Sequence, residues 1–225
     1  MLRGLIFDMD GVLIDSHPVH RKAWRRFLAT IGKEVDDEQL DFILEGRRRE
    51  EILRYFLGDL PAGMMAEYGQ LKEKFFQENF TDVRLIPGID AFLDEARAAG
   101  FQLGLATSAS AYRTRETLRQ LQLENTFRAT ITGDDVPAGK PDPSVYRLAA
   151  ERMRVSSKQL LVLEDAPCGV RAAQAAGMRC IGIASNGRAD ALRQAGAEAI
   201  IPNFLQFSVK NVLAFWQGTA ACNFA

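Results

Sequence analysis

Short apolar runs alternate with segments of helical periodicity along most of this chain. The run Leu5-Ile6-Phe7 has no polar interruption, as in strands that are buried on both faces of a parallel sheet. The predicted strands are residues 5–7, 101–106, 129–131, 160–163, 179–184 and 199–201. Apolar residues between them recur every three or four positions, as over residues 89–96, which predicts helices. Strands that alternate with helices from residue 84 onward predict a parallel sheet with helices on both faces.

The region after the first strand interrupts this alternation. Trp24, Phe27 and Ile31 fall on one face of a predicted helix that Gly32 ends, and residues 34–81 continue as short helical pieces. We therefore predict an α/β fold in which a Rossmann-like parallel sheet core carries an inserted, all-helical cap domain. Residues 1–14 and 84–225 would form the core, and residues 15–83 would form the cap.

Polar residues follow four of the predicted core segments. These residues are Asp8 and Asp10, Thr107 and Ser108, Lys140, and Glu164 and Asp165. Ligands of open α/β sheets bind beyond the carboxyl ends of the strands, so these side chains are candidates for one site. Each has a simpler interpretation: a turn at Asp8, a helix cap at Thr107, a solvated lysine, a surface acidic pair. Together they supply what phosphoryl transfer through a divalent metal requires.

Composition excludes several other classes of function. The 225 residues carry a net charge of −1 with a pI near 6.2, so no basic surface is expected to attract nucleic acid. No apolar run has the length of a membrane helix, and the chain starts in its first strand, so we expect neither a membrane span nor a signal peptide. Cys168, Cys180 and Cys222 lack metal-ligand spacing and indicate reduced thiols in a cytoplasmic protein.

Four stretches, taken together and in order, identify a family. They are Asp8-Met9-Asp10-Gly11-Val12, Leu105-Ala106-Thr107-Ser108, Gly139-Lys140-Pro141-Asp142-Pro143 and Leu163-Glu164-Asp165-Ala166-Pro167-Cys168-Gly169-Val170. In these stretches, which span nearly the whole chain, the sequence resembles the haloacid dehalogenase-like hydrolases with a helical cap after the first strand. Within that superfamily it is similar to the phosphatase and β-phosphoglucomutase branch.

The resemblance implies a role for each catalytic residue. Asp8 would be the nucleophile that carries the phosphoryl group as an aspartyl-phosphate, which divides one difficult displacement into two easier ones. Asp10 would protonate the leaving oxygen and then activate water. Thr107 and the amide of Ser108 would hold phosphoryl oxygens, and Lys140 would neutralise the transferring group.

The same resemblance implies magnesium as the cofactor. Mg²⁺ would bind the carboxylates of Asp8 and Asp165, the main-chain carbonyl of Asp10, and water, an oxygen set that suits this ion. Glu164 would lie in or just behind this set of ligands.

The cap residues implied by the resemblance are His20, Gly46, Arg49 and Lys74. His20 would couple cap closure to the acid/base aspartate, although a packed histidine fits the helical pattern as well. Gly46 and Arg49 match a substrate-contacting cap loop, while at least one arginine of the run 47–49 is expected on a solvated face. Lys74 matches a further cap residue of the mutases, with Lys72 adjacent in register.

One departure from the family favours a phosphatase over a mutase. The mutases carry a Lys-Asn pair after the strand that ends in Thr107, whereas this chain has Ala109-Ser110-Ala111-Tyr112 and no cation there. Asp10 argues against dehalogenation, because a halide leaves without a proton. A non-enzymatic binding module or a receiver-like domain would lack some of these residues or the cap. We expect a small phosphorylated metabolite, of the sugar phosphate kind, as substrate, and a monomer or weak homodimer.

Overall fold

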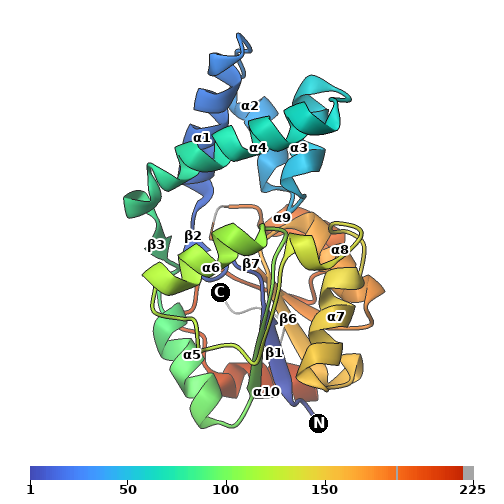
Figure 1. Cartoon of the computed structure of the whole chain (residues 1–225). Coiled ribbons are helices and arrows are strands. Elements are labelled where there is room, and N and C mark those ends of the chain that lie inside the picture. Colours follow the sequence, from blue (N-terminus) through green and yellow to red (C-terminus); the bar gives the residue numbers. More distant parts are fainter. Residues whose placement is uncertain (186, 220–225) are drawn as a thin grey trace.

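A parallel sheet forms the centre of the molecule in a computed structural model that describes residues 1–185 and 187–219. Across the sheet the strands are β5 (Ala129–Ile131), β4 (Gln102–Ala106), β1 (Gly4–Phe7), β6 (Leu160–Glu164), β7 (Arg179–Ile183) and β8 (Ala199–Ile201). Every neighbouring pair is parallel. The first strand of the chain therefore lies in the middle of the sheet, between β4 and β6 (Figure 1).

Six helices cover the two faces of this sheet. One face packs against α5 (Ile89–Ala98), α6 (Ala111–Gln120) and α10 (Val209–Gln217), and the other against α7 (Ser144–Met153), α8 (Pro167–Ala175) and α9 (Ala189–Ala195). Successive side chains of a strand point to opposite faces, so Leu5 and Phe7 join the first apolar cluster while Ile6 joins the second. All three are fully buried, which explains the uninterrupted apolar run in the sequence.

Four helices lie above the carboxyl edge of the sheet (Figure 1). They are α1 (His17–Thr30), α2 (Asp37–Leu40), α3 (Arg49–Leu57) and α4 (Ala62–Gln77). Rings pack between them: the centroid of Trp24 lies 5.8 Å from that of Phe27 and 6.1 Å from that of Phe56. We call these helices the cap helices. A two-stranded antiparallel ribbon, β2 (Ile14–Asp15) with β3 (Arg84–Leu85), joins them to the sheet.

The prediction of an α/β fold with a parallel, Rossmann-like sheet is confirmed. The residue boundaries of core and cap remain a prediction, although β2 and β3 lie where the chain leaves and re-enters the sheet region. Short 3₁₀ turns complete the described elements: η1 (Asp41–Leu44), η2 (Phe80–Asp82), η3 (Gly133–Asp135) and η4 (Ser157–Gln159). Within the described ranges, no helix is both long and apolar enough to span a membrane. Cys168 and Cys180 are buried free thiols, and Cys222 lies outside the described residues.

Candidate active site

The central strand β1 delivers Asp8 to the sheet edge. Phe7 is in register with Leu105 of β4 and Leu163 of β6, so the residue after it emerges among the polar residues that follow those strands. The Asp8 amide donates to the Leu163 carbonyl at 3.0 Å, which continues the ladder one residue beyond the strand. The Asp8 side chain is thus fixed by the backbone, and the residue is only 6% exposed.

Lys140 holds two carboxylates together beneath the site. Its ammonium donates to Asp8 Oδ1 at 2.5 Å, to Glu164 Oε1 at 2.5 Å and to the Ala106 carbonyl at 3.2 Å. The hydroxyl of Tyr146 donates to the same Glu164 oxygen at 3.0 Å. Three donated bonds satisfy the whole ammonium, so this buried lysine is locked in position.

The charges in this cluster shift one another's protonation. Burial raises the pKa of Asp8 well above its ordinary value, Lys140 opposes the shift, and Glu164 and Asp165 add to it. Burial lowers the pKa of Lys140, but Asp8 and Glu164 outweigh burial and the net shift is upward. The lysine therefore stays charged, and the negative charge around Asp8 exceeds what this single cation neutralises.

Glu164 does not face the cavity, so of its two expected places, in or just behind the metal ligands, the second fits the geometry. Besides the bonds to Lys140 and Tyr146, its Oε2 accepts the Ala166 amide at 2.8 Å, and the residue is fully buried. Glu164 is the last residue of β6 and Asp165 the first beyond it, so the pleat sends their side chains in different directions. Glu164 therefore positions Lys140, and only Asp165 lines the cavity.

Asp165 lies on the other side of Asp8 and contacts a histidine. His17 Nε2 lies 3.1 Å from Asp165 Oδ2. Burial raises the pKa of Asp165, an effect that His17 opposes. Gly11, at a φ of +74°, makes room for this carboxylate, because a Cβ at that residue would lie 2.2 Å from Asp165 Oδ2. The sequence analysis assigned no role to His17.

The residues at this edge fit a magnesium ion. Two buried carboxylates, Asp8 and Asp165, both have pKa values raised by burial and by surrounding negative charge, so a cation there would be stabilised. No group of three or more His, Cys, Asp or Glu side chains in the described chain could hold a metal on its own. Mg²⁺ commonly takes one or two carboxylates and keeps several waters, so two carboxylates with the Asp10 carbonyl suit it.

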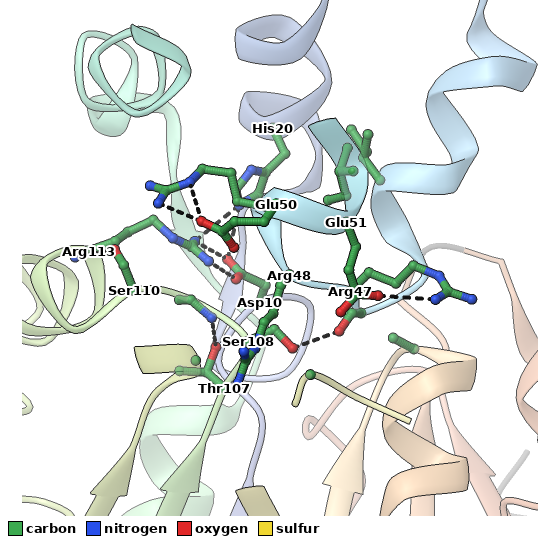
Figure 2. A pocket seen from close by; sticks show the side chains of 18 of the residues that line it. Asp10, His20, Arg47, Arg48, Glu50, Glu51, Thr107, Ser108, Ser110 and Arg113 are labelled. Atoms are coloured by element: carbon green, nitrogen blue, oxygen red, sulfur yellow. Dashed lines mark hydrogen bonds and ion pairs between the residues drawn. The ribbon is translucent and has the colours of Figure 1, made fainter. Parts of the chain in front are cut away.

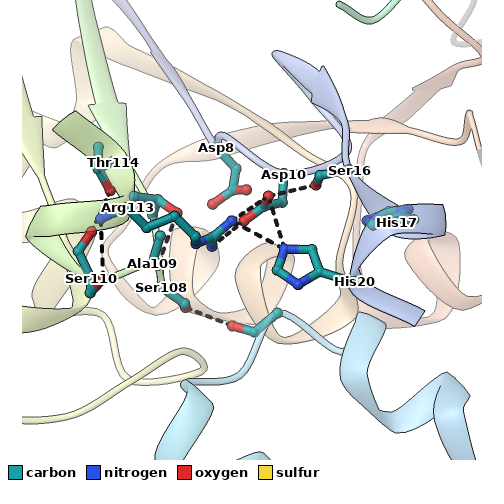
Figure 3. A network of polar contacts seen from close by, with 12 residues as sticks. Asp8, Asp10, Ser16, His17, His20, Ser108, Ala109, Ser110, Arg113 and Thr114 are labelled. Carbon is teal, nitrogen blue, oxygen red and sulfur yellow. Dashed lines mark hydrogen bonds and ion pairs between the residues drawn. The ribbon is translucent and has the colours of Figure 1, made fainter. Parts of the chain in front are cut away.

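Asp10 is held by an arginine that the sequence analysis missed. Arg113 donates from both terminal nitrogens, to Asp10 Oδ1 at 2.8 Å and to Asp10 Oδ2 at 2.6 Å (Figure 3). The hydroxyl of Ser16 donates to Oδ1 at 2.5 Å, and His20 Nε2 lies 3.4 Å from the same oxygen. Burial raises the pKa of Asp10, but Arg113 and His20 outweigh burial and the net pKa lies well below its usual range.

A core cation that the sequence analysis did not consider lies just beyond residues 109–112. Ala109 to Ala111 supply none, but Arg113 follows in the first turn of α6 and reaches the site. The N-cap residue Ser110 accepts the Arg113 amide at 3.3 Å, which fixes the start of that helix and the direction of the guanidinium. The signal was the helix start: a residue three positions after an N-cap lies in the first turn, close to the strand end.

Thr107 and Ser108 lie where the core meets the cap helices (Figure 2). Thr107 is 1% exposed, and its hydroxyl accepts the Ala109 amide at 3.1 Å. The hydroxyl of Ser108 donates to the Gly46 carbonyl at 2.7 Å. Gly46 has a φ of +80° and lies so close to the core that a Cβ there would be 2.8 Å from the Cβ of Ala166. Gly46 therefore serves close approach of cap and core, with no side chain to bind substrate.

A cavity of about 620 Å³ separates the cap helices from the sheet edge. Arg47, Arg48 and Arg49 all line it, and the side chains of Arg47 and Arg49 are each still 31% exposed. Arg48 donates to the core carbonyls of Val136 at 2.5 Å and Pro137 at 3.3 Å. Arg47, which precedes α3, and Arg49, its first residue, form ion pairs with glutamates of α3, Glu51 at 3.2 Å and Glu50 at 2.8 Å. Arg49 is thus placed at the cavity, held by a partner that a stronger anion can replace.

Of two neighbouring lysines of α4, one lies at the cavity and the other does not. Lys72 is 3% exposed, lines the cavity, and has its ammonium 2.9 Å from His20 Nδ1. Lys74 is exposed and outside the cavity lining, which corrects its predicted place. Burial lowers the pKa of His20 to about 3, with Lys72 contributing, so the imidazole is neutral. Burial lowers the pKa of Lys72 to about 7.

Comparison with known proteins agrees with this geometry. The family model of haloacid dehalogenase-like hydrolases matches residues 5–183 of the chain. The "Phosphorylated carbohydrates phosphatase" of Thermotoga maritima is 32% identical over 223 residues, covering 94% of this chain and 100% of that protein. The chain therefore belongs to the haloacid dehalogenase-like hydrolase family, as the four motifs predicted.

Two further proteins that are similar to this chain are β-phosphoglucomutases. The "Beta-phosphoglucomutase" of Bacillus subtilis is 29% identical over 196 residues, with 81% of this chain and 83% of that protein covered. A crystal structure of β-phosphoglucomutase from Clostridium difficile superposes with a TM-score of 0.87 over 97% of this chain and 98% of that one. At 21% sequence identity this second similarity establishes the fold alone. An enzyme of the phosphatase class of this family is confirmed, and mutases stand among its relatives.

Proposed function

We propose that this protein hydrolyses a small phosphorylated metabolite, of the sugar phosphate class, through a phosphoryl group carried by Asp8. One observation carries the proposal: the Asp8 carboxylate lies at the buried floor of a polar cavity, with Lys140 on one oxygen and Asp10 two residues away. The named phosphatase of Thermotoga maritima, aligned over nearly the whole chain, supports the substrate class.

In the first step an Asp8 carboxylate oxygen attacks phosphorus and the bond from phosphorus to the sugar oxygen breaks. Asp10 must enter this step protonated, which requires release from the Arg113 contacts that lower its pKa. It then gives that proton to the leaving oxygen, so the sugar departs as an alcohol. Lys140 keeps its contact with Asp8 and lowers the repulsion between the carboxylate and the incoming phosphoryl group. Bound at Asp8 and Asp165, Mg²⁺ would offset the charge of the phosphoryl oxygens.

In the second step water replaces the sugar. Asp10, now a carboxylate, accepts a proton as the water oxygen attacks phosphorus, and the bond from phosphorus to Asp8 breaks to release inorganic phosphate. Arg113 and His20 favour the ionised form of Asp10 that this step needs. The cap helices shield the site from bulk water, and the arginines lining the cavity contact the rest of the substrate.

The second candidate is a sugar phosphate mutase, which two observations favour. One is the mutase among the relatives, and the other is the core cation Arg113, which removes one argument against a mutase. Hydrolysis remains the better proposal because the phosphatase of Thermotoga maritima aligns with 94% of this chain and the mutase of Bacillus subtilis with 81%.

A phosphate-release assay over a panel of sugar and nucleotide monophosphates tests this function. We expect inorganic phosphate from at least one sugar phosphate, loss of release in excess chelator, and recovery on adding Mg²⁺. β-Glucose 1-phosphate with a trace of the 1,6-bisphosphate separates the two candidates. Rapid formation of glucose 6-phosphate with little free phosphate would replace the hydrolase with the mutase.

The setting that we propose is the cytoplasm, with the protein a monomer or weak homodimer. The buried free thiols of Cys168 and Cys180 support a reducing compartment. The balanced net charge supports a small-molecule partner rather than a nucleic acid.

A further inference from the structure

Both oxygens of Asp10 are occupied in this structure. Oδ1 accepts from Arg113 and Ser16 and lies 3.4 Å from His20, and Oδ2 accepts from Arg113 (Figure 3). The two guanidinium bonds form a fork on the carboxylate, which is the most directional ion-pair geometry available to an arginine. The fork favours the charged form of Asp10, so Asp10 can carry a proton to a leaving group only after at least one of these contacts breaks.

Arg113 cannot simply turn away from Asp10. The residue is 6% exposed and stacks its guanidinium 5.3 Å above the ring of Phe76. Among the described residues, Asp10 is the one acidic side chain within ion-pair distance of it. Removing the partner of a buried charge is strongly destabilising, so the guanidinium leaves Asp10 only when another anion receives it.

A second buried cation lies beside Arg113 with no acidic partner. Lys72 comes from the cap helix α4, is 3% exposed, and forms no ion pair among residues 1–185 and 187–219. Its ammonium lies 5.6 Å from the centroid of the Trp24 ring and 5.0 Å from that of Phe76. His20 stands between the two cations, 2.9 Å from Lys72 and 3.1 Å from Arg113. The guanidinium of Arg113 and the amine of Lys72, whose pKa burial lowers to about 7, thus lie near one carboxylate in a buried corner of the cavity.

We propose that the corner formed by Arg113, Lys72 and His20 receives a second anionic group of the substrate. That group, a phosphate or a carboxylate, takes the guanidinium from Asp10 and lets Asp10 turn to the leaving oxygen. The inference rests on the proposed phosphatase function and narrows its substrate to phosphate esters with a further negative charge. Arg113 is then a positioning residue for Asp10 as well as the specificity-determining contact.

This arrangement predicts which kinetic constant the binding of the second anion changes. An ester with a neutral far end can reach Asp8 but leaves Asp10 pinned, so it turns over slowly even when bound. A doubly anionic ester exchanges one buried ion pair for another and releases the acid/base residue. Its second charge therefore raises kcat and does not only lower KM. The guanidinium fork matches phosphate and carboxylate alike.

Splitting the substrate into two pieces tests the inference on the unmodified protein. Ethyl phosphate at saturating concentration supplies the reacting ester, and phosphite, acetate or chloride is added at constant ionic strength. We expect phosphite or acetate to raise kcat for ethyl phosphate about 10²-fold, the value of one or two charge-assisted bonds. Activation by phosphite identifies a phosphate as the second group, and activation by acetate a carboxylate. Activation by neither beyond chloride would overturn the inference.

Two arginines of the same helix provide the matched variants. Arg113→Gln should lose the activation, and Arg113→Lys should recover part of it, because an ammonium keeps the charge but loses the fork. Arg115→Gln is the control: that arginine is on α6, its side chain is 69% exposed, and its nearest carboxylate is Glu116 at 4.0 Å. Full activation in a folded Arg113→Gln protein would refute the role of the guanidinium. If that variant does not fold, the experiment on the unmodified protein decides alone.

The same measurements separate this inference from the proposed function. Phosphate release from sugar phosphates without any effect of the added anions would leave the proposed hydrolysis intact. It would refute the second anion site at Arg113, Lys72 and His20. If no ester, singly or doubly charged, releases phosphate, both the proposed hydrolysis and the second anion site are refuted.

Discussion

The site has two halves, the nucleophile half around Asp8 and the acid half around Asp10, and they are built in different ways. The half around Asp8 consists of core residues alone: Lys140, Glu164 and Asp165 sit at strand ends or in the loop beside them, and each is at most 3% exposed. The half around Asp10 draws on the ribbon after β1 and on helices of both regions, with His20 and Lys72 from the cap and Arg113 from α6.

This difference separates what is fixed from what can be regulated. The nucleophile half follows from the register of three parallel strands, although Asp165 also contacts His17 at the start of α1. The acid half has its present contacts only while α1 and α4 stand over the sheet edge. Movement of the cap would therefore change the surroundings of Asp10 while leaving Asp8 and Lys140 in place.

The largest effect is expected from the nucleophile itself. Asp8→Asn preserves shape but removes the attacking oxygen, so turnover should fall by about 10⁴-fold or more, as for other deleted nucleophiles. Phosphate release measures the loss, and circular dichroism checks the fold. Asp94→Asn, at an exposed position of α5, should retain full turnover. Comparable turnover in the Asp8 and Asp94 variants would rule out covalent catalysis at Asp8.

The next effect concerns stability in the nucleophile half. Lys140→Met leaves the buried carboxylates of Asp8 and Glu164 without their cation, and the free energy of unfolding should drop by about 3–5 kcal/mol. Urea denaturation measures it. Lys158→Met, a substitution at an exposed lysine, should change stability by about 0.5 kcal/mol or less. A Lys140 variant as stable as the Lys158 variant would mean that the buried cluster is not held by charge.

A smaller effect is expected in the cap. Arg49→Ala should lower kcat/KM for the sugar phosphate about tenfold, because a charge-assisted contact at the cavity is lost, while p-nitrophenyl phosphate is hardly affected. Lys74→Ala is the control, since that lysine is exposed and outside the cavity lining. Equal losses on both esters would assign Arg49 a structural role.

The smallest effect is a pH dependence of stability from His20. Its pKa falls to about 3 in the folded protein from 6.5, so the unfolded chain binds the extra proton between these values. Stability is therefore lost as the pH falls below 6.5, by about 1 kcal/mol between pH 7 and pH 5.5. His20→Gln should lack this contribution, so the difference between the two urea midpoints should narrow with acidification. The pKa of His17 is raised, so His17 changes stability with pH in the opposite direction to His20. It does so equally in both proteins, so its contribution cancels from the difference between them. A constant difference would mean that His20 is not neutral when folded.

The sequence predicts the nucleophile half more fully than the acid half, for a physical reason. Strand ends are local signals: an apolar run followed at once by Asp8, Thr107 or Glu164 marks both the strand and its edge. Parallel pairing then brings those ends together. The direction of a side chain at such an end is less certain, as Glu164 illustrates, because it depends on whether the residue still belongs to the pleat.

The acid half depends on helix phase and tertiary contacts. Lys72 precedes the buried Phe76 by four residues and so shares its face, a signal that would have favoured it over Lys74. For Arg113, the start of α6 indicates a place near the strand end. Its contact with Asp10 follows from the distance between α6 and Asp10, which no local pattern shows. The strands β2 and β3 are two residues each, too short for any periodicity to appear.

Rapid-quench mass spectrometry of the phosphorylated enzyme tests the central claim most directly. Mixing the protein with its sugar phosphate and Mg²⁺ and quenching within milliseconds should place one phosphoryl group on the peptide that contains Asp8. The adduct should be labile to hydroxylamine, as an acyl phosphate is, and absent from the Asp8→Asn protein. Phosphate release with no adduct on that peptide, or with the phosphoryl group on His17 or His20, would contradict the assignment of Asp8 as the nucleophile.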